Sequence, residues 1–256
     1  RNVWAIFRRE LSAYFNSPIA YVVLALFIFL FGAFFYTYLI NFIQFGLQMS
    51  QSPYGATRTM NLNQDLIRWL LGTTNLLIVF MLPLITMRSL AEEKRSGTIE
   101  LLLTSPVTDF EIVLGKFLAA LALYGSMLGL TFIHMAFLFL YGDPEWKPLV
   151  AGYLGLLLMG GAFISLGILF SSLTKNQIVA AFLSFGVFLF LYIIEVAEVW
   201  AGPYWGSVIS YLSVTKHTED FAKGVIDTKD LVYYLSFIGF GLFLSKQSVE
   251  SHRWRG

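Results

Sequence analysis

The chain has 256 residues, of which 57% are hydrophobic and 13% are charged, and its formal net charge is +1. Soluble domains carry about 25% charged residues because their surfaces face water, so this composition excludes an ordinary soluble globule and predicts a protein surrounded by lipid. The near-zero net charge provides no basic surface, and we expect no nucleic-acid partner. The absence of cysteine excludes disulfides and thiolate metal sites.

The first predicted element is an amphipathic helix over residues 2–15. Trp4, Phe7 and Leu11 fall on one face of this helix, whereas Arg8 and Arg9 fall elsewhere. A basic amphipathic helix that contains Trp is typical of the headgroup region of a membrane. The sequence leaves open whether the apolar face only anchors the chain or also contacts a partner.

Six stretches without Asp, Glu, Lys or Arg then predict membrane-spanning helices. A helix needs about 20 residues to cross about 30 Å of hydrocarbon, and five of the stretches reach or approach that length. The expected helices cover residues 19–45, 66–95, 109–141, 149–173, 176–196 and 228–248. The apolar stretch in the last of them has only 15 residues, so a re-entrant or surface helix is the alternative there.

The distribution of basic residues predicts the orientation in the membrane. If the N-terminus is cytoplasmic, 11 of the 17 Lys and Arg residues lie in cytoplasmic segments. Cytoplasmic segments normally carry this excess, so both termini are expected on the cytoplasmic side. Because no repeat and no Pro/Gly/Ser-rich linker divides the chain, we expect one all-α membrane domain over residues 1–256.

The segment between the second and third expected spans combines signals that stop and restart a helix. Charged residues cluster over 88–95, where the second span is expected to leave the membrane. Gly97 suits the left-handed residue that ends a helix, and Thr98 can then cap a very short helix with Glu100 in its first turn. That short helix would expose three consecutive leucines, which are Leu101, Leu102 and Leu103.

The restart after this short helix is equally well marked. Thr108 and Glu111 have the spacing of a capping box at the start of the third span. A short helix that is fixed at both ends can transmit movement to the spans that flank it, which a flexible loop cannot do. Its three exposed leucines are expected to be buried against another apolar surface. Lipid is one such surface and a protein partner is the other, and the pattern favours the partner.

The motifs of nucleotide and metal chemistry are absent from the sequence. It has no G-x-x-x-x-G-K-[ST] loop to hold a nucleotide phosphate and no H-E-x-x-H, and its three histidines are scattered. An intramembrane enzyme would need a paired nucleophile and base, and the sequence shows no such pair. We therefore expect no catalytic residue and no metal site in this chain.

Residues 92–106, which read EEKRSGTIELLLTSP, resemble the cytoplasmic loop of the permease subunits of type-2 ABC transporters, and Lys116 fits the same pattern. Residues 211–227 and 250–254 are similar to a branch that contains gliding-motility-associated and nitrous-oxide-reductase-accessory permeases. The resemblance implies six spans per subunit, with two permease subunits and two ATPase subunits in each transporter. We expect the second permease subunit to be a copy of this chain, with a different permease as the alternative, and we expect the complex in the cytoplasmic (inner) membrane of a bacterium.

The resemblance further assigns roles to residues. It implies that residues 98–104 form a coupling helix that docks on the ATPase, and that ATP and Mg²⁺ bind in that partner, with no cofactor in this chain. The residues implied for ATPase coupling are Glu92, Glu93, Arg95, Gly97, Thr98, Glu100, Leu101, Leu102 and Leu103. The translocation path is implied to follow spans two and five, where the polar candidates are Thr73, Thr74, Asn75 and Ser184. Short external helices are expected around residues 199–212, between spans five and six.

Two functional hypotheses follow from the sequence. In the first, the chain is the transmembrane subunit of an ATP-driven ABC transporter, and a separate ATPase subunit drives the export or movement of an unidentified substrate. In the alternative, it is a permease-like anchor or force-transmitting subunit of an envelope complex, such as one for motility or metalloenzyme maturation, and nothing crosses the membrane. An auxiliary envelope protein is a further expected partner in that case.

Overall fold

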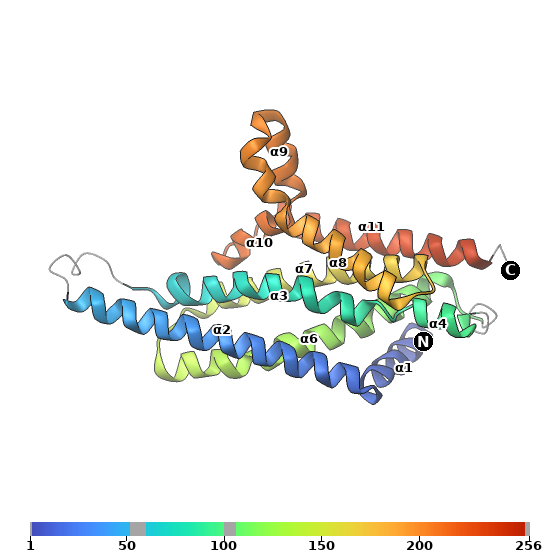
Figure 1. Cartoon of the computed structure of the whole chain (residues 1–256), viewed down its shortest axis with the longest axis horizontal. Helices are drawn as coiled ribbons and strands as arrows, with labels where there is room; N and C mark the ends of the chain where they lie inside the picture. The colour runs from blue at the N-terminus through green and yellow to red at the C-terminus, as the bar shows by residue number, and fades with distance from the viewer. Residues whose placement is uncertain (1, 52–59, 100–105, 254–256) are drawn as a thin grey trace.

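The computed structural model of the chain describes residues 2–51, 60–99 and 106–253. Within these ranges the secondary structure consists of helices, which confirms the predicted all-α fold. The long helices run roughly along one common axis, and α1, α4 and the C-terminal end of α11 lie at the same end of the bundle (Figure 1).

The described helices follow one another from the N-terminus to the C-terminus. Their order is α1 (Asn2–Asn16), α2 (Pro18–Gln51), the π-helix η2 (Asn63–Ile67), α3 (Arg68–Thr86), α4 (Ala91–Ser96), α6 (Asp109–Tyr141), α7 (Trp146–Leu173), α8 (Gln177–Ile193), the 3₁₀ helix η3 (Ile194–Trp200), α9 (Gly202–Leu212), α10 (Val214–Ala222) and α11 (Thr228–Arg253). The short helices expected around residues 199–212 are present as the end of η3 and as α9, whereas α10 was not expected. Helix α9 stands out steeply from the bundle (Figure 1).

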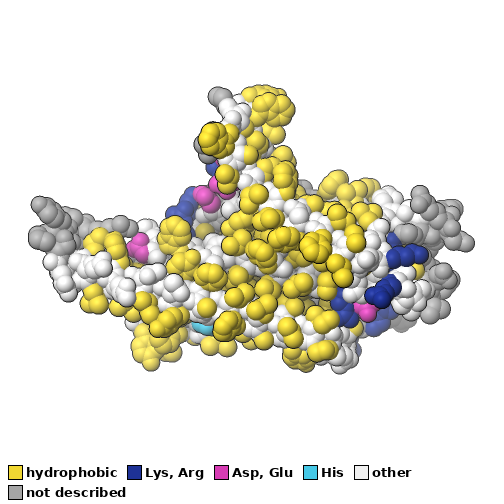
Figure 2. Space-filling model, in the orientation of Figure 1, with side chains coloured by type: hydrophobic (Ala, Val, Ile, Leu, Met, Phe, Trp, Pro, Cys, Tyr) yellow, Lys and Arg dark blue, Asp and Glu magenta, His cyan; other side chains and the backbone are white. Residues whose placement is uncertain are grey.

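Five helical segments of the described chain are long and apolar enough to cross a membrane. They are Pro18–Gln51, Asn63–Ser96, Asp109–Tyr141, Trp146–Leu173 and Gln177–Glu198. The sixth expected span, 228–248, lies within α11, a helix of 26 residues that does not meet the same criterion, so six spans stay a prediction. Figure 2 shows hydrophobic side chains over the middle of the face in view and Lys and Arg side chains gathered at the end that carries α1 and α4.

Helix α7 lies at the centre of the packing and contacts α3, α6, α8, α10 and α11. Its glycines allow these close approaches. A Cβ atom on Gly155 would lie 2.7 Å from Cβ of Phe221 on α10, and one on Gly160 would overlap the ring of Tyr124 on α6. Small residues are favoured at such contacts because lipid tails are as apolar as leucine, so membrane helices associate through close packing.

The sequence predicts one helix over 66–95, whereas the structure divides it into α3 and α4 with a turn at residues 87–90. A single hydroxyl group from α7 stabilises this turn. Ser171 Oγ accepts hydrogen bonds from the backbone N–H groups of Leu90 and Ala91 and donates to the Met87 carbonyl, each at 3.0 Å. Buried backbone groups need such partners, so the break depends on a residue 80 positions away in the sequence.

We predict that Gly160→Ala destabilises the bundle by about 1–3 kcal/mol, because Tyr124 must leave its place beside α7. The displaced phenol would also lose its 2.7 Å hydrogen bond to the Leu156 carbonyl. Gly125→Ala on α6 is the matched control, since a Cβ atom there meets no neighbouring atom within 4 Å. Thermal unfolding in detergent measures the difference, and equal stability of the two variants would contradict the packing described here.

Candidate functional site

Four charged side chains join α1, α4 and α6 at the end of the bundle that the sequence analysis assigns to the cytoplasm. The ammonium group of Lys116 on α6 is only 2% exposed and lies 2.9 Å from Oε1 of Glu93 and 3.1 Å from Oε1 of Glu10. Arg9 Nη2 contacts the same two oxygens, at 3.1 Å and 2.5 Å respectively. Two cations and two carboxylates therefore neutralise one another, which is the condition for burying charge at this depth. We call these four residues the Lys116 cluster.

The Lys116 cluster changes the protonation behaviour of Glu10. Burial by itself would raise the pKa of this carboxyl, but the charges and hydrogen bonds of Lys116 and Arg9 outweigh burial and hold the pKa below its ordinary value of 4.5. Glu10 therefore stays ionised at neutral pH. The amphipathic helix α1 is tied to the bundle by charge as well as by its buried residue Ile6, which lies against Gly115 of α6.

Helix α4 is fixed to α7 on its other side. Lys94 is 6% exposed, and its ammonium group donates a hydrogen bond to the Ser172 carbonyl near the C-terminal end of α7. Gly97 ends α4 with φ of 74°, in the left-handed region that favours glycine. Beyond this rigid attachment, Arg95 and Thr98 are exposed at the tip of the helix.

The third span begins with a second rigid attachment. Thr108 is the N-cap of α6: its hydroxyl accepts a hydrogen bond from the Glu111 N–H at 3.3 Å, and the Glu111 carboxylate accepts one from the Thr108 N–H at 2.9 Å. The side-chain amide of Asn2 also donates a hydrogen bond to this carboxylate, at 3.4 Å, so α1 helps to hold the start of α6 in place. The chain between Gly97 and Thr108 is thus held at both ends.

Some of the residues predicted for ATPase coupling lie where α1, α4 and α6 meet. Glu93 belongs to the Lys116 cluster, and Glu92 pairs with Arg88 at 2.9 Å. The rest of the expected coupling helix falls outside the described residues, and this part comprises Glu100, Leu101, Leu102 and Leu103. Sequence reasoning missed Glu10, because one acidic residue on a basic amphipathic helix carries no distinctive pattern.

The residues predicted for the translocation path separate into two groups. Thr73 and Asn75 line a groove of about 570 Å³ between α2, α3, α8 and α10. Thr73 is hydrogen-bonded to the Tyr38 hydroxyl at 2.6 Å. Thr74 and Ser184, by contrast, are buried and donate to carbonyl groups one turn earlier in their own helices. The structure therefore places two of the four candidates, Thr73 and the buried Asn75, beside the groove.

Asn75 has the less common environment of the two groove residues. Its side chain is 7% exposed and donates to the Thr218 hydroxyl on α10 at 3.4 Å. Its amide oxygen is buried without a hydrogen-bond partner among the described residues. An unsatisfied acceptor beside a groove is a group that a bound molecule with a donor can satisfy.

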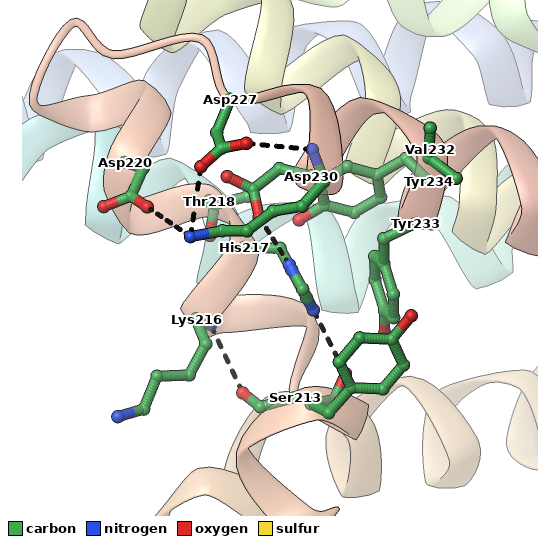
Figure 3. Close-up of polar contacts among 12 residues, drawn as sticks. Ser213, Lys216, His217, Thr218, Asp220, Asp227, Asp230, Val232, Tyr233 and Tyr234 are labelled. Atoms are coloured by element: carbon green, nitrogen blue, oxygen red, sulfur yellow. Dashed lines mark hydrogen bonds and ion pairs between the residues drawn. The ribbon is translucent and has the colours of Figure 1, made fainter. Parts of the chain in front are cut away.

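A second polar centre, which the sequence analysis did not identify, lies between α10 and α11 (Figure 3). His217 Nδ1 lies 2.6 Å from Oδ1 of Asp230, and both side chains are buried. The ring of Tyr233 stacks on the imidazole with 3.8 Å between centroids, and the Tyr234 hydroxyl donates to the Val214 carbonyl. Residues 13 positions apart form this pair, so no local motif indicates it. In the described part of the chain no group of three or more potential metal ligands occurs.

Comparison with known proteins assigns the family. Residues 4–242 match the model of the ABC-2 family transporter proteins. The chain belongs to the ABC-2 family. The match covers all five candidate spans and the Lys116 cluster, and it confirms the predicted class of transporter permease. The narrower resemblance to gliding-motility and nitrous-oxide-reductase permeases stays a prediction.

Two curated relatives of this ABC-2 chain come from Escherichia coli, one from strain K12 and one from O157:H7. Both carry the name "Probable multidrug ABC transporter permease YbhR" and are 28% identical to the chain over 145 residues. The aligned part is 56% of this chain and 39% of each relative, so the chain spans about two fifths of their length.

We predict that Lys116→Met destabilises the protein by roughly 3 kcal/mol, because two partly buried carboxylates lose the ammonium group that they share. Lys246→Met is the matched control. Lys246 pairs with Glu250 at 3.3 Å with both side chains 36% exposed, and a surface pair of this kind contributes less than about 1 kcal/mol. Chemical or thermal unfolding in detergent measures both values, and similar losses in the two variants would show that the cluster is not a structural unit.

The lowered pKa of Glu10 predicts a specific loss of stability in acid. Because the folded-state pKa lies below 4.5, the stabilisation is fully present above pH 4.5 and is lost as the pH falls through the folded-state value. Glu10→Gln should therefore flatten the acid side of the curve of melting temperature against pH, and should lower stability at neutral pH. Wild-type and variant curves that run parallel below pH 4.5 would contradict this assignment.

Proposed function

We propose that the chain is the permease subunit of an ATP-driven transporter, and that a separate ATPase subunit supplies the energy. Membership of the ABC-2 family supports a transmembrane transporter subunit. The sequence has no phosphate-binding loop of its own, so ATP and Mg²⁺ would bind in the partner. Two ATPase subunits and two permease subunits, in the inner membrane of a bacterium, make up the proposed complex.

The observation that carries this proposal is the attachment of the loop after α4 at both ends. On one side α4 is held by the Lys116 cluster and by the contact of Lys94 with α7. On the other side the capping box fixes the start of α6. Force applied to the chain between these attachments would therefore be transmitted to α4 and α6.

The proposed mechanism follows from these connections. Closure of the ATPase dimer on ATP moves the loop, and α4 carries the movement to α1 and α6 through the Lys116 cluster. The turn at 87–90 passes it to α3, whose Thr73 and Asn75 line the groove. Binding energy of ATP in the partner would in this way shift the equilibrium between inward-facing and outward-facing states.

The groove beside α3 and α8 suggests where a second permease subunit lies. The groove is open, and its lining includes Trp69 of α3, which is 64% exposed. Phe80 of α3 and Phe182 of α8 are further exposed apolar residues of the two helices. A second copy of this chain would close the groove into a path lined by amide, hydroxyl and aromatic groups and by the charged side chains of Arg68 and Glu219. Such a lining suits an amphipathic cargo, in keeping with the multidrug designation of the relatives.

The test replaces the leucines of the loop. In the complex with its ATPase, the double variant Leu101→Asp and Leu102→Asp should lower ATP-dependent transport into membrane vesicles by about tenfold or more, because buried apolar anchors dominate such contacts. Membrane insertion should be unchanged. The matched control is Val225→Asp with Ile226→Asp, two residues that are 54% and 52% exposed in the loop before α11, away from the ATPase.

Three outcomes of this test are distinct. Loss of transport in the leucine variant alone supports coupling through the loop. Unchanged complex assembly and unchanged transport in that variant would refute it. If the wild-type complex hydrolyses ATP but moves no compound into vesicles, the chain is instead an anchor or force-transmitting subunit of an envelope assembly.

A further inference from the structure

A hollow of about 380 Å³ lies between the C-terminal half of α2 and the segment that leads into η2. It is at the end of the bundle opposite α1 and α4, which the sequence analysis assigns to the outside of the membrane. In Figure 1 this end of α2 reaches beyond the neighbouring ends of α3 and α6. The hollow is large enough for a small molecule, since ligand pockets measure about 300–1,000 Å³.

The length of α2 places this hollow outside the hydrocarbon layer. Helix α2 begins at Pro18, and because about 20 residues cross the layer, the crossing ends near Tyr38. Tyr36 and Tyr38 are residues of the kind that marks a membrane–water interface. The amide side chains of the hollow follow Tyr38 along the helix. A ligand therefore reaches the hollow from water rather than from lipid.

Three side-chain amides line the hollow, and they belong to Asn41, Gln44 and Gln48. Their spacing puts them on one face of α2 over about 10 Å. All three residues are exposed, and no hydrogen bond joins their side chains to another described residue. Each amide therefore offers both hydrogen-bond donors and an acceptor to a molecule in the hollow.

Aromatic rings complete the lining. Phe42 and Phe45 contribute to the same hollow, and Phe45 is 40% exposed. The described lining contains no Lys or Arg, and its one carboxylate, Asp65, accepts a hydrogen bond from the Asn61 N–H at 3.0 Å. The hollow thus has no positive charge that would select an anion, and most of its polar groups are uncharged.

We infer that this hollow binds an uncharged saccharide outside the membrane. A sugar ring has hydroxyl groups around its edge, and these both donate and accept hydrogen bonds as the amides do. Its faces carry C–H groups, which pack against the negative faces of aromatic rings. The row of amides extends over about 10 Å, the length of about two sugar rings. A purely apolar ligand fits less well, because it would remove the amides from water without pairing them.

The experiment measures binding to the full chain in phosphatidylcholine nanodiscs by isothermal titration calorimetry. Alkyl maltoside detergents are avoided, because their headgroups are themselves disaccharides. The probes are three uncharged disaccharides, which are maltose, cellobiose and N,N′-diacetylchitobiose. At least one of them should bind saturably to the wild-type protein. The double variant Asn41→Ala with Gln44→Ala should weaken that binding by about tenfold or more, because it removes two amides that pair with hydroxyl groups.

Two further variants make the result decisive. Gln51→Ala is the matched control, since Gln51 is exposed on α2 one turn beyond Gln48 and lies outside the described lining. This variant should bind like the wild type. Phe45→Leu keeps an apolar side chain but removes the flat ring face, so it should weaken binding by about threefold or more. The melting temperature of each variant confirms that it is folded.

The inference is overturned if none of the three disaccharides binds saturably to the wild-type protein, or if the double variant and Gln51→Ala bind equally well. Binding that Phe45→Leu leaves unchanged would also contradict it, because the sugar would then lie away from the ring. The hollow shares Tyr38 with the groove beside α3 but lies outside the proposed coupling route. The experiment needs no ATPase subunit, so its outcome is independent of the proposed coupling function.

Discussion

The ammonium group of Lys116 is almost completely removed from water, and it must therefore lie beside negative charge. Glu10 and Glu93 provide that charge from two different helices, and Arg9 balances it. Because removing one member of such a group leaves an uncompensated buried charge, α1, α4 and α6 are held in one arrangement. The amphipathic helix α1 is in this way part of the same rigid corner as α4.

The same constraint explains how the second span can end in a turn without weakening the bundle. Unpaired backbone groups at the turn would be costly in an apolar environment, and the Ser171 hydroxyl pairs with three of them, at Met87, Leu90 and Ala91. Lys94 of α4 adds a hydrogen bond to the backbone carbonyl of Ser172, the next residue of α7. The corner that carries the loop is therefore built on α7, the helix whose glycines allow the closest packing in the bundle.

The polar groups of the protein divide into three regions with different physical character. At one end, Lys116 and Arg9 pair with the Oε1 atoms of Glu10 and Glu93, which gives rigidity, whereas Oε2 of Glu93 has no hydrogen-bond partner among the described residues. Along the groove, Asn75 has an amide oxygen without a partner, and at the base of α9 Asp230 has a free carboxylate oxygen. Under the proposed function, the paired charges transmit movement, and the groove beside Asn75 holds the transported molecule.

Composition and apolar runs were sufficient to predict an all-α membrane protein, because charge is excluded from long stretches of helix surrounded by lipid. Local signals also sufficed for the end of α4 at Gly97 and for the cap formed by Thr108 and Glu111, since these depend only on neighbouring residues. Only the tertiary structure decided which polar residues meet. Glu10 and Lys116, Ser171 and Leu90, and His217 and Asp230 are far apart in sequence or carry no local motif, and their contacts arise from helix packing, which no single segment encodes.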